Sequence, residues 1–282
     1  MRLPEWIRTR TYADLHDTKH LLRRHRLSTV CEEARCPNMG ECFSKPTATF
    51  MILGSKCTRN CGFCSVSHAV PESVDENEPG NVAGAAEEMG LKYIVITSVT
   101  RDDLPDGGAA HFARTIIAIR GKMPSAKVEV LTPDFKGDLK SLKTVLDARP
   151  DVFNHNVETV ERLYPYVRPD ADFRRSLYIL DQAKEIAPER YTKSGFMLGL
   201  GETHEEVIGL LQDLRKSRCD FITIGQYLRP NRNNLAVVEY IKPGIFEALK
   251  MKALDMGFKF VASGPLVRSS MNAEEMYLIS EQ

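Results

Sequence analysis

The stretch SKCTRNCGFCSV, residues 55–66, contains three cysteines in the spacing C-x3-C-x2-C: Cys57, Cys61 and Cys64. It directly follows an apolar, β-leaning run at Ala48–Leu53. Iron–sulfur cubanes normally take four cysteine ligands, and this loop supplies three. One iron would then keep an open coordination position, as a catalytic metal does. Zinc is the alternative metal, with His68 as its fourth ligand.

The chain around this stretch alternates between strand-like and helix-like segments. Further strands are expected at Tyr93–Thr97, Lys127–Leu131, Val152–His155, Gly195–Leu198, Phe221–Gly225 and Lys259–Ala262. Helices are expected at Val82–Met89, Ala109–Lys122, Leu139–Asp147, Phe173–Ile186, Glu205–Lys216 and Ile245–Met256. Short apolar strands alternating with helices predict a buried parallel sheet with right-handed crossovers. The fold class is therefore α/β, either a partial barrel or an open doubly wound sheet.

Residues 1–47 show no convincing strand, and the segment PESVDENEPG at 71–80 predicts a loop. We expect three parts along the chain. Residues 1–47 form an N-terminal extension, residues 48–262 form the strand–helix domain, and residues 263–282 form a C-terminal tail. The basic run at 23–26 is typical of a solvated helix face, with an acidic protein partner as the alternative.

Composition narrows the class of protein. The 282 residues carry 38 basic and 38 acidic side chains, which argues against a general binder of nucleic acid or anionic membranes. Charges interrupt the N-terminus where a signal peptide is apolar, and no apolar run approaches the roughly 20 residues that span a bilayer. We therefore expect a cytoplasmic protein, in which clustered cysteines are metal ligands before they are disulfides.

A second cysteine triad lies in VCEEARCPNMGECF, residues 30–43, at Cys31, Cys36 and Cys42. Proline, asparagine and glycine between these cysteines favour the bends that bring thiolates together. Three thiolates are again one short of the usual four. Cys219 could be the fourth ligand, but its position just before an apolar strand favours a buried core thiol.

The C-x3-C-x2-C loop after the first strand of such a fold resembles the radical S-adenosylmethionine (SAM) superfamily. That resemblance implies a partial (β/α)6 barrel whose open iron is chelated by the amino and carboxylate groups of SAM. It also implies a 5′-deoxyadenosyl radical that removes hydrogen from an unactivated carbon. No side-chain base can deprotonate an alkane, so this step belongs to the cofactor.

Both triads together with Arg268-Ser269-Ser270 closely resemble the lipoyl synthase family. In that family a serine of a C-terminal RSSY motif is the unusual fourth ligand of an auxiliary [4Fe-4S] cluster. The resemblance implies that Cys31, Cys36 and Cys42 hold this cluster with Ser270 or Ser269, and Ser270 is favoured. Met271 stands where the family usually has tyrosine. The N-terminal extension and the tail would close over the barrel mouth.

The resemblance also suggests SAM contacts at the ends of strands. Ser98, Arg101, Asp102 and Asp103 follow the second strand in TSVTRDDLPDGGA, the location that holds the SAM amino group in the superfamily. Asn156 and Glu158 end the fourth strand and are assigned to SAM or substrate. An arginine of VRPDADFRRSL could pair with the SAM carboxylate through a bidentate fork, and the candidates are Arg168, Arg174 and Arg175.

The resemblance implies insertion of sulfur at C6 and C8 of a protein-bound octanoyl group, with the auxiliary cluster as the sulfur source. Implied cofactors are two [4Fe-4S] clusters and SAM. Implied partners are an octanoylated lipoyl carrier domain or glycine-cleavage H-type protein, a ferredoxin or flavodoxin type electron donor, and an iron–sulfur cluster carrier. The alternatives are another sulfur-inserting enzyme of the biotin synthase type and a non-catalytic iron–sulfur carrier or redox sensor.

Overall fold

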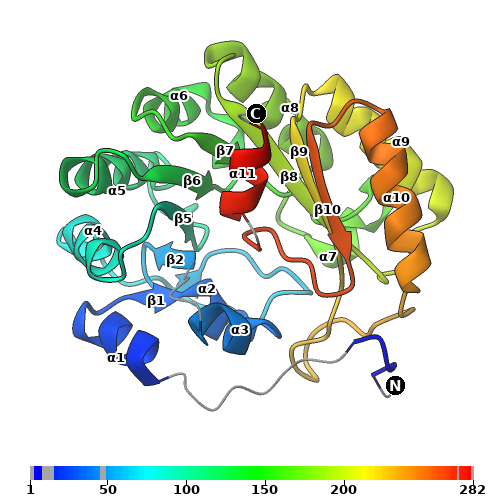
Figure 1. The fold of residues 1–282 in the computed structure, drawn as a ribbon, viewed down its shortest axis with the longest axis horizontal. Coiled ribbons are helices and arrows are strands. Elements are labelled where there is room, and N and C mark those ends of the chain that lie inside the picture. The colour runs from blue at the N-terminus through cyan, green and yellow to red at the C-terminus, as the bar shows by residue number, and fades with distance from the viewer. Residues whose placement is uncertain (1–2, 8–15, 45–48, 272, 281–282) are drawn as a thin grey trace. The chain divides into compact units, whose positions relative to one another are not determined.

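The computed structural model describes residues 3–7, 16–44, 49–271 and 273–280 (Figure 1). These residues form two compact units. The N-terminal unit comprises the described residues of Thr9–Arg59 and Ser65–Phe153. The C-terminal unit comprises those of Met1–Arg8, Asn60–Cys64 and Asn154–Gln282. The predicted boundary at residues 47 and 48 lies outside the described residues, and the division into extension, barrel and tail stays a prediction.

The N-terminal unit is built on strands in the order β1 (Ser28–Thr29), β2 (Thr49–Ile52), β5 (Tyr93–Ser98), β6 (Lys127–Leu131) and β7 (Val152–Asn154). The β2, β5 and β6 strands are parallel, with Thr49 opposite Val95 and Tyr93 opposite Lys127. The expected strands are therefore present. The expectation of no strand in the first 47 residues was wrong, because β1 runs antiparallel to the edge of β2. A two-residue strand leaves no periodic pattern in a sequence.

The helices of this unit are α1 (His16–Arg24), α2 (Val30–Glu33), α3 (Met39–Ser44), α4 (Glu78–Glu88), α5 (Ala109–Lys122) and α6 (Leu139–Asp147), with a 3₁₀ turn, η1, at Phe135–Gly137. In Figure 1, α4, α5 and α6 lie side by side next to β2, β5 and β6. The α5 and α6 helices have the predicted bounds. The α4 helix begins earlier, inside the predicted loop at 71–80, because Pro79 suits the first helical turn. A separate parallel pair, β3 (Lys56–Cys57) and β4 (Ser67–His68), flanks the cysteine loop.

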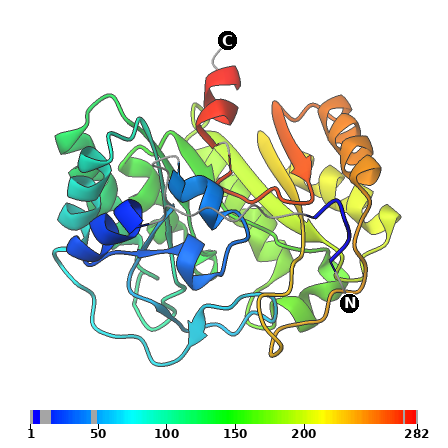
Figure 2. The same ribbon diagram turned by 60° about the horizontal axis from the view of Figure 1, so that its bottom comes forward.

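The C-terminal unit contains η2 (Glu161–Leu163), α7 (Tyr164–Val167), α8 (Phe173–Ile186), β8 (Tyr191–Leu198), α9 (His204–Lys216), β9 (Phe221–Gln226), α10 (Pro243–Asp255), β10 (Phe260–Gly264) and α11 (Ala273–Ser280). Its strands are parallel in the order β8-β9-β10, with Lys193 and Phe260 both opposite Phe221. Both ribbon views show α10 alongside β10 (Figures 1 and 2). The strand–helix alternation predicted from the sequence holds here too.

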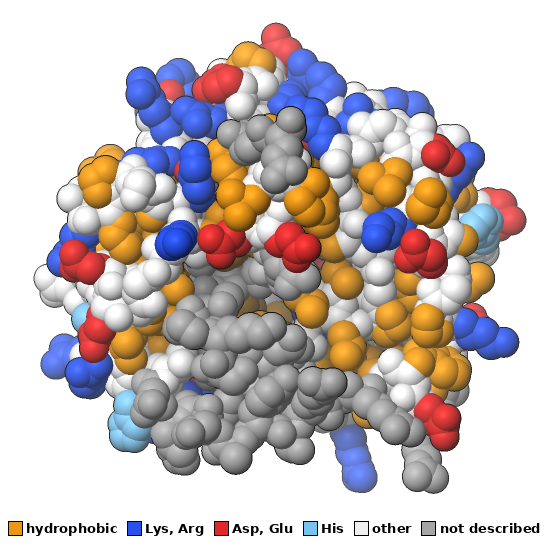
Figure 3. Space-filling model, in the orientation of Figure 1, with side chains coloured by type: hydrophobic (Ala, Val, Ile, Leu, Met, Phe, Trp, Pro, Cys, Tyr) orange, Lys and Arg blue, Asp and Glu red, His pale blue; other side chains and the backbone are white. Residues whose placement is uncertain are grey.

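The core of the C-terminal unit lies between its strands and helices. Leu180, Leu211 and Ile222 are fully buried in it, and Phe63 from the cysteine loop packs against it. On the outside, Figure 3 shows hydrophobic side chains among charged ones over α10. Isolated apolar side chains on a surface are ordinary, because polar atoms are too few to cover a protein. In the described residues, no helix combines the length and apolar character that crossing a membrane requires.

Candidate functional site

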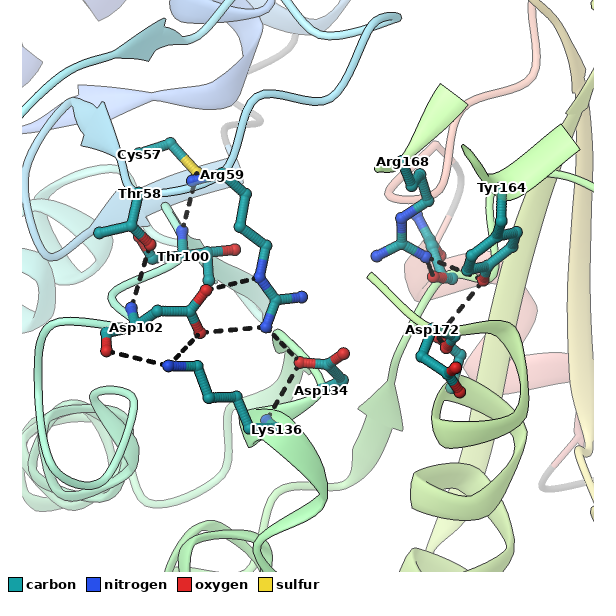
Figure 4. A network of polar contacts seen from close by, with 12 residues as sticks. Cys57, Thr58, Arg59, Thr100, Asp102, Asp134, Lys136, Tyr164, Arg168 and Asp172 are labelled. Carbon is teal, nitrogen blue, oxygen red and sulfur yellow. Dashed lines mark hydrogen bonds and ion pairs between the residues drawn. The ribbon is translucent and has the colours of Figure 1, made fainter. Parts of the chain in front are cut away.

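Cys57 ends β3 in the N-terminal unit and is held by backbone donors. Its Sγ accepts the N–H of Thr100 at 3.3 Å and the N–H of Arg59 at 3.5 Å (Figure 4). The hydroxyl of Thr58 donates to the carbonyl of Thr100 at 3.0 Å and accepts the N–H of Asp102 at 3.0 Å. These contacts join the cysteine loop to the loop that follows β5. The two backbone N–H groups fix the position of the Cys57 sulfur, and cysteine sulfur is the usual ligand of iron–sulfur clusters.

The Arg59 side chain is the centre of this network. Its Nε donates to Oδ2 of Asp102 at 2.7 Å, and its Nη2 donates to Oδ1 of Asp102 at 3.0 Å and to Oδ1 of Asp134 at 2.6 Å. Arg59 and Asp134 are buried. The hydrogen bonds and charges of the two carboxylates raise the pKa of Arg59 above its ordinary value, against the opposing effect of burial. The guanidinium therefore stays charged and fixes the backbone between Cys57 and Cys61.

The expected SAM contacts of this unit differ in whether their polar groups already have a hydrogen-bond partner. The carboxylate of Asp102 is engaged by Arg59, as described above. The hydroxyl oxygen of Ser98, at the end of β5, is buried and has no hydrogen-bond partner among the described residues. Arg101 and Asp103 pair with each other at 2.8 Å, and this arginine lowers the pKa of Asp103. Ser98 is thus the candidate in this loop with a polar group left for a ligand.

The second half of the cysteine loop, Asn60–Cys64, belongs to the C-terminal unit. It forms a turn in which the N–H of Cys64 donates to the carbonyl of Cys61 at 3.1 Å. The N–H of Gly62 donates to the carbonyl of Val167 at 2.9 Å. A Cβ at Gly62 would lie 2.9 Å from Cγ of Leu235 and 3.1 Å from the carbonyl oxygen of Tyr166, so any larger residue would force these neighbours to shift.

The first cysteine triad gathers around α2 in the N-terminal unit. The α2 helix is capped by Thr29, whose Oγ1 accepts the N–H of Glu32 at 3.4 Å. The N–H of Cys36 then donates to the carbonyl of Cys31 at 3.0 Å. Burial raises the pKa of the Cys31 thiol to about 12, and the nearby Cys36 and Cys42 add to the rise. The fold therefore brings Cys31 and Cys36 together at the end of α2, and their use with Cys42 as ligands of one cluster stays a prediction.

The two cysteine-bearing stretches are joined by one hydrogen bond inside the N-terminal unit. The hydroxyl of Ser65, the residue after Cys64, donates to the carbonyl of Glu33 at 2.6 Å. Glu33 lies at the end of α2, two positions after Cys31. Segments separated by 32 positions in the sequence are thus adjacent in the fold. This contact ties the first triad to the segment that follows the second.

The C-terminal tail contacts the end of β7 through Ser269, within the C-terminal unit. The hydroxyl of Ser269 accepts from Nδ2 of Asn154 at 2.9 Å and donates to Oδ1 of Asn156 at 3.1 Å. Both asparagines are buried. The tail also passes directly over β9, because a Cβ at Gly225 would lie 2.3 Å from the carbonyl oxygen of Val267. The serine motif of the tail is thereby brought to the carboxyl ends of the strands.

The remaining candidates of this unit lie in different environments. Arg168 is buried and donates from Nη1 to the carbonyls of Asn156 at 2.8 Å and Val157 at 3.3 Å. Glu158 has a positive φ of 65° and a pKa that loss of hydration raises, while Arg168, Asn156 and Arg268 act in the opposite direction. Arg174 is 70% exposed and pairs with Glu161 at 2.8 Å. Its assignment to the SAM carboxylate stays a prediction that the geometry does not favour.

The cysteines of the chain are all reduced thiols in this structure. All seven cysteines lie in the described part of the chain, and none forms a disulfide. Cys219 is fully buried before β9, and burial raises its pKa, so it is the core thiol that the sequence suggested. Within the described ranges, no group of three or more histidine, cysteine or acidic side chains is arranged so that it could hold a metal ion, and the assignment of either triad to iron stays a prediction.

Three residues whose side chains support the cysteine loop were not predicted from the sequence: Arg59, Asp134 and Asn234. Arg59 lies inside the quoted cysteine motif, and Asp134 follows a predicted strand, so both carried a signal. Asn234 carried none. It lies in a long irregular loop after β9, yet its Nδ2 donates to the carbonyls of Gly62 at 3.2 Å and Cys64 at 2.7 Å.

The chain is similar in sequence to known proteins of one superfamily. The signature of the Radical SAM superfamily matches residues 51–214. The chain is 56% identical over 276 residues to a lipoyl synthase of Caldicellulosiruptor bescii, covering 97% of this chain and 95% of that protein. It is 55% identical to a lipoyl synthase of Alkaliphilus metalliredigens, with 97% and 95% covered, and 52% identical to one of Laribacter hongkongensis, with 98% and 88% covered.

Comparison with solved structures concerns the fold. Streptococcus suis SuiB bound to S-adenosylmethionine matches with a TM-score of 0.59 and 11% identity, covering 80% of this chain and 54% of that one. Methylornithine synthase (PylB) matches with a TM-score of 0.55 and 13% identity, covering 89% and 82%. The predicted fold class, an α/β partial barrel of radical SAM type, is confirmed by these similarities and by the parallel strands.

Proposed function

Because the chain belongs to the lipoyl synthase family of the radical SAM superfamily, we propose specific sites for two iron–sulfur clusters. In this proposal Cys57, Cys61 and Cys64 hold the [4Fe-4S] cluster that the superfamily requires for SAM. The first triad holds a second, auxiliary cluster. The observation that carries the second assignment is the local fold of this triad, in which the N–H of Cys36 donates to the carbonyl of Cys31 at 3.0 Å and the N–H of Cys42 donates to the carbonyl of Asn38 at 3.0 Å.

The reaction of this family is the insertion of two sulfur atoms at C6 and C8 of a protein-bound octanoyl group. The enzyme therefore acts on a lipoyl-carrier substrate and needs a reductant. We propose that the carrier is an octanoylated lipoyl domain or a glycine-cleavage H-type protein. We propose a ferredoxin or flavodoxin type electron donor and an iron–sulfur carrier that restores the auxiliary cluster. The biotin-synthase-like and non-catalytic alternatives gain no support from the curated relatives.

The donor chemistry of the cysteine loop supports the proposal of a cluster that leaves one iron for SAM. Three thiols, none of them in a disulfide, follow the first parallel strand, and Cys57 already accepts two backbone N–H groups. When bound there, the cluster supplies the electron that cleaves SAM, a step that no side chain of this protein could perform. The protein's part is to hold the loop rigid, because positioning rather than proton transfer controls this type of reaction. Arg59 with its two carboxylates does this in the N-terminal unit.

The auxiliary cluster needs a fourth ligand beyond its three cysteines. Ser269 is engaged by Asn154 and Asn156, which hold its hydroxyl in a fixed orientation. We therefore assign the ligand role to Ser270 and a positioning role to Ser269. A hydroxyl oxygen is a harder ligand than a thiolate and binds iron less firmly, which suits a cluster that gives up sulfur.

The contacts of the other candidate residues suggest a role for each of them in SAM binding or in support of the site. The buried hydroxyl of Ser98 is proposed to contact SAM, since it has no hydrogen-bond partner in the part of the chain that the structure describes. Asp102 supports Arg59, and Arg168 orients the segment that carries Asn156 and Glu158. Glu158 keeps its proposed contact with SAM or substrate, because its carboxylate lies near Arg168 and Arg268 at the strand end.

One assay tests the proposed function directly. Anaerobically reconstituted, reduced protein is incubated with SAM and a peptide that carries octanoyl-lysine. The expected product is the peptide with two added sulfur atoms, detected by mass. Deoxyadenosine formation without sulfur in the peptide would contradict the sulfur-insertion assignment, and the absence of any SAM cleavage would contradict the radical SAM site.

A further inference from the structure

The turn that carries Cys61 and Cys64 is held by a loop far away in the sequence. Asn234 lies in the irregular segment between β9 and α10 of the C-terminal unit. Its Nδ2 donates to the carbonyl oxygen of Cys64 at 2.7 Å and to that of Gly62 at 3.2 Å. The next residue, Leu235, donates its backbone N–H to the carbonyl of Gly62 at 3.0 Å. One amide side chain and one backbone group thus donate to the carbonyls of Gly62 and Cys64 in the turn.

The Asn234 loop is itself fixed to the core. The hydroxyl of Tyr227, which is buried directly after β9, donates to the carbonyl of Leu235 at 2.8 Å. Leu235 packs against the hydrophobic core together with Phe63 of the turn. The turn is therefore connected through Asn234 and Leu235 to the buried strands of this unit, and not merely to a surface loop.

The contact requires a hydrogen-bond donor at this position, which the amide of Asn234 supplies. A side-chain amide offers two N–H donors, and both carbonyls of the turn are satisfied from the single Nδ2 atom. An aspartate has the same shape but presents oxygen acceptors to these carbonyl oxygens, so the attraction becomes a repulsion. Loss of a group that orients metal ligands from outside typically lowers metal affinity or activity by about 10- to 100-fold.

We propose that Asn234 is a positioning residue for the SAM cluster: it fixes the Cys61–Cys64 turn so that both thiolates reach the cluster in one geometry. This inference rests on the proposed function, because it takes Cys57, Cys61 and Cys64 as cluster ligands. It goes further by naming the residue outside the cysteine motif that sets the position of two of the three ligands. Asn234 acts through the turn and not on the substrate.

The test uses Asn234→Asp and Asn234→Ala in the full chain lacking the auxiliary thiols through Cys31→Ala, Cys36→Ala and Cys42→Ala. The matched control is Asn233→Asp, which adds the same charge at the exposed neighbouring residue. Both Asn234 variants should lose cluster iron to a chelator about 10- to 100-fold faster than the control. Their reduced cluster should also give an altered electron paramagnetic resonance spectrum, with a weakened response to added SAM.

The outcomes separate this inference from the proposed function. If the parent protein holds a SAM-responsive cluster and the Asn234 variants match Asn233→Asp in spectrum and iron loss, the positioning role is refuted alone. If the Asn234 variants lower the melting temperature of the iron-free protein while spectrum and iron loss stay unchanged, Asn234 is merely structural and the inference also fails. If the parent protein holds no SAM-responsive cluster, both the proposed function and this inference fall.

Discussion

At the scale of single residues, the site depends on side chains that hold the ligands in place. Arg59 is buried between Asp102 and Asp134, so its charge is compensated and its position is fixed. A buried charged group of this kind is costly to leave without a partner. Arg174, in contrast, is an exposed arginine with one surface partner. The sequence suggested both Arg174 and Asp102 as SAM contacts. In the structure, Asp102 instead supports the buried Arg59, and Arg174 forms an ion pair at the surface.

Ser269 and Ser270 provide a test at this scale. Ser269→Ala removes the hydroxyl that joins Asn154 and Asn156, so the tail is held less firmly. The expected result is SAM cleavage near the normal rate, with the yield of thiolated peptide reduced about tenfold. Ser270→Ala, which removes the proposed ligand, should abolish the thiolated peptide and still allow SAM cleavage. Both are measured by mass spectrometry of peptide and deoxyadenosine.

The conservative variant Ser269→Thr, which keeps the hydroxyl, serves as the control. It should restore most of the product. If Ser269→Ala gave the thiolated peptide at normal yield, the positioning role of Ser269 would be wrong. If Ser270→Ala did so, Ser270 would not be the ligand.

At the scale of elements, three helices have the predicted bounds, whereas α4 and the strand β8 begin earlier than predicted. The α5, α6 and α8 helices have the predicted bounds, because each has a clear apolar face. The β8 strand begins at Tyr191, earlier than the predicted Gly195. Its first residues include Thr192, Lys193 and Ser194, which are polar and yet buried. Ser194 donates to the carbonyl of His155 at 2.9 Å, a contact that satisfies a polar group inside the protein.

The start of α9 gives a prediction on pH and stability. Thr203 and Glu206 form a capping box, and Arg162 binds the Glu206 carboxylate at 2.6 Å. The hydrogen bond from Arg162, the largest cause, lowers the pKa of Glu206 to about 2. The ionised Glu206 therefore stabilises the fold fully above its unfolded pKa of about 4.3, and this contribution is lost as the pH falls from there through about 2.

Urea unfolding at about pH 5 and about pH 2.5 gives the loss of stability on acidification, which should be smaller for Glu206→Gln than for the parent protein. The difference arises because the Glu206 carboxyl titrates in the window of roughly pH 4.3 to 2. The effect should be small, because the Glu206 side chain is 26% exposed and water screens the pair. Thr203→Ala should cost about 1 kcal/mol at neutral pH, because it removes the cap. An identical pH profile for Glu206→Gln and the parent protein would contradict the assignment.

At the scale of the whole molecule, the proposed chemistry requires two clusters in one chain. The reconstituted protein should hold about eight irons, from two cubanes. Replacing Cys31, Cys36 and Cys42 by alanine should leave about four irons, and replacing the other triad should also leave about four. Iron and sulfide are measured together after anaerobic reconstitution.

Cys219→Ala is the matched control for that measurement. Cys219 is buried and donates from Sγ to the carbonyl of Phe221 at 3.2 Å, so its removal should not change the iron content. A saturated parent protein with about four irons would contradict the two-cluster proposal. A loss of iron in Cys219→Ala would instead assign that thiol a ligand role.

The sequence by itself determined the kind of chemistry and the order of strands and helices. The spacing of Cys57, Cys61 and Cys64 is a local property of the chain, and so is the apolar pattern of each element; both can be read without knowing the fold. The same is true of the spacing of the first triad, whereas the contact between the N–H of Cys36 and the carbonyl of Cys31 at 3.0 Å comes from the fold.

The tertiary structure alone decided which side chains support the ligands. Asn234 reaches the carbonyl of Cys64 across 170 positions of sequence, and Ser269 reaches Asn154 across 115. Such pairs have no period or spacing in the sequence, because a hydrogen bond depends on where the backbone brings two groups and not on their separation along the chain. The structure also separated buried charged side chains such as Arg59 from exposed ones such as Arg174. The two kinds differ in their hydration, which no sequence pattern records.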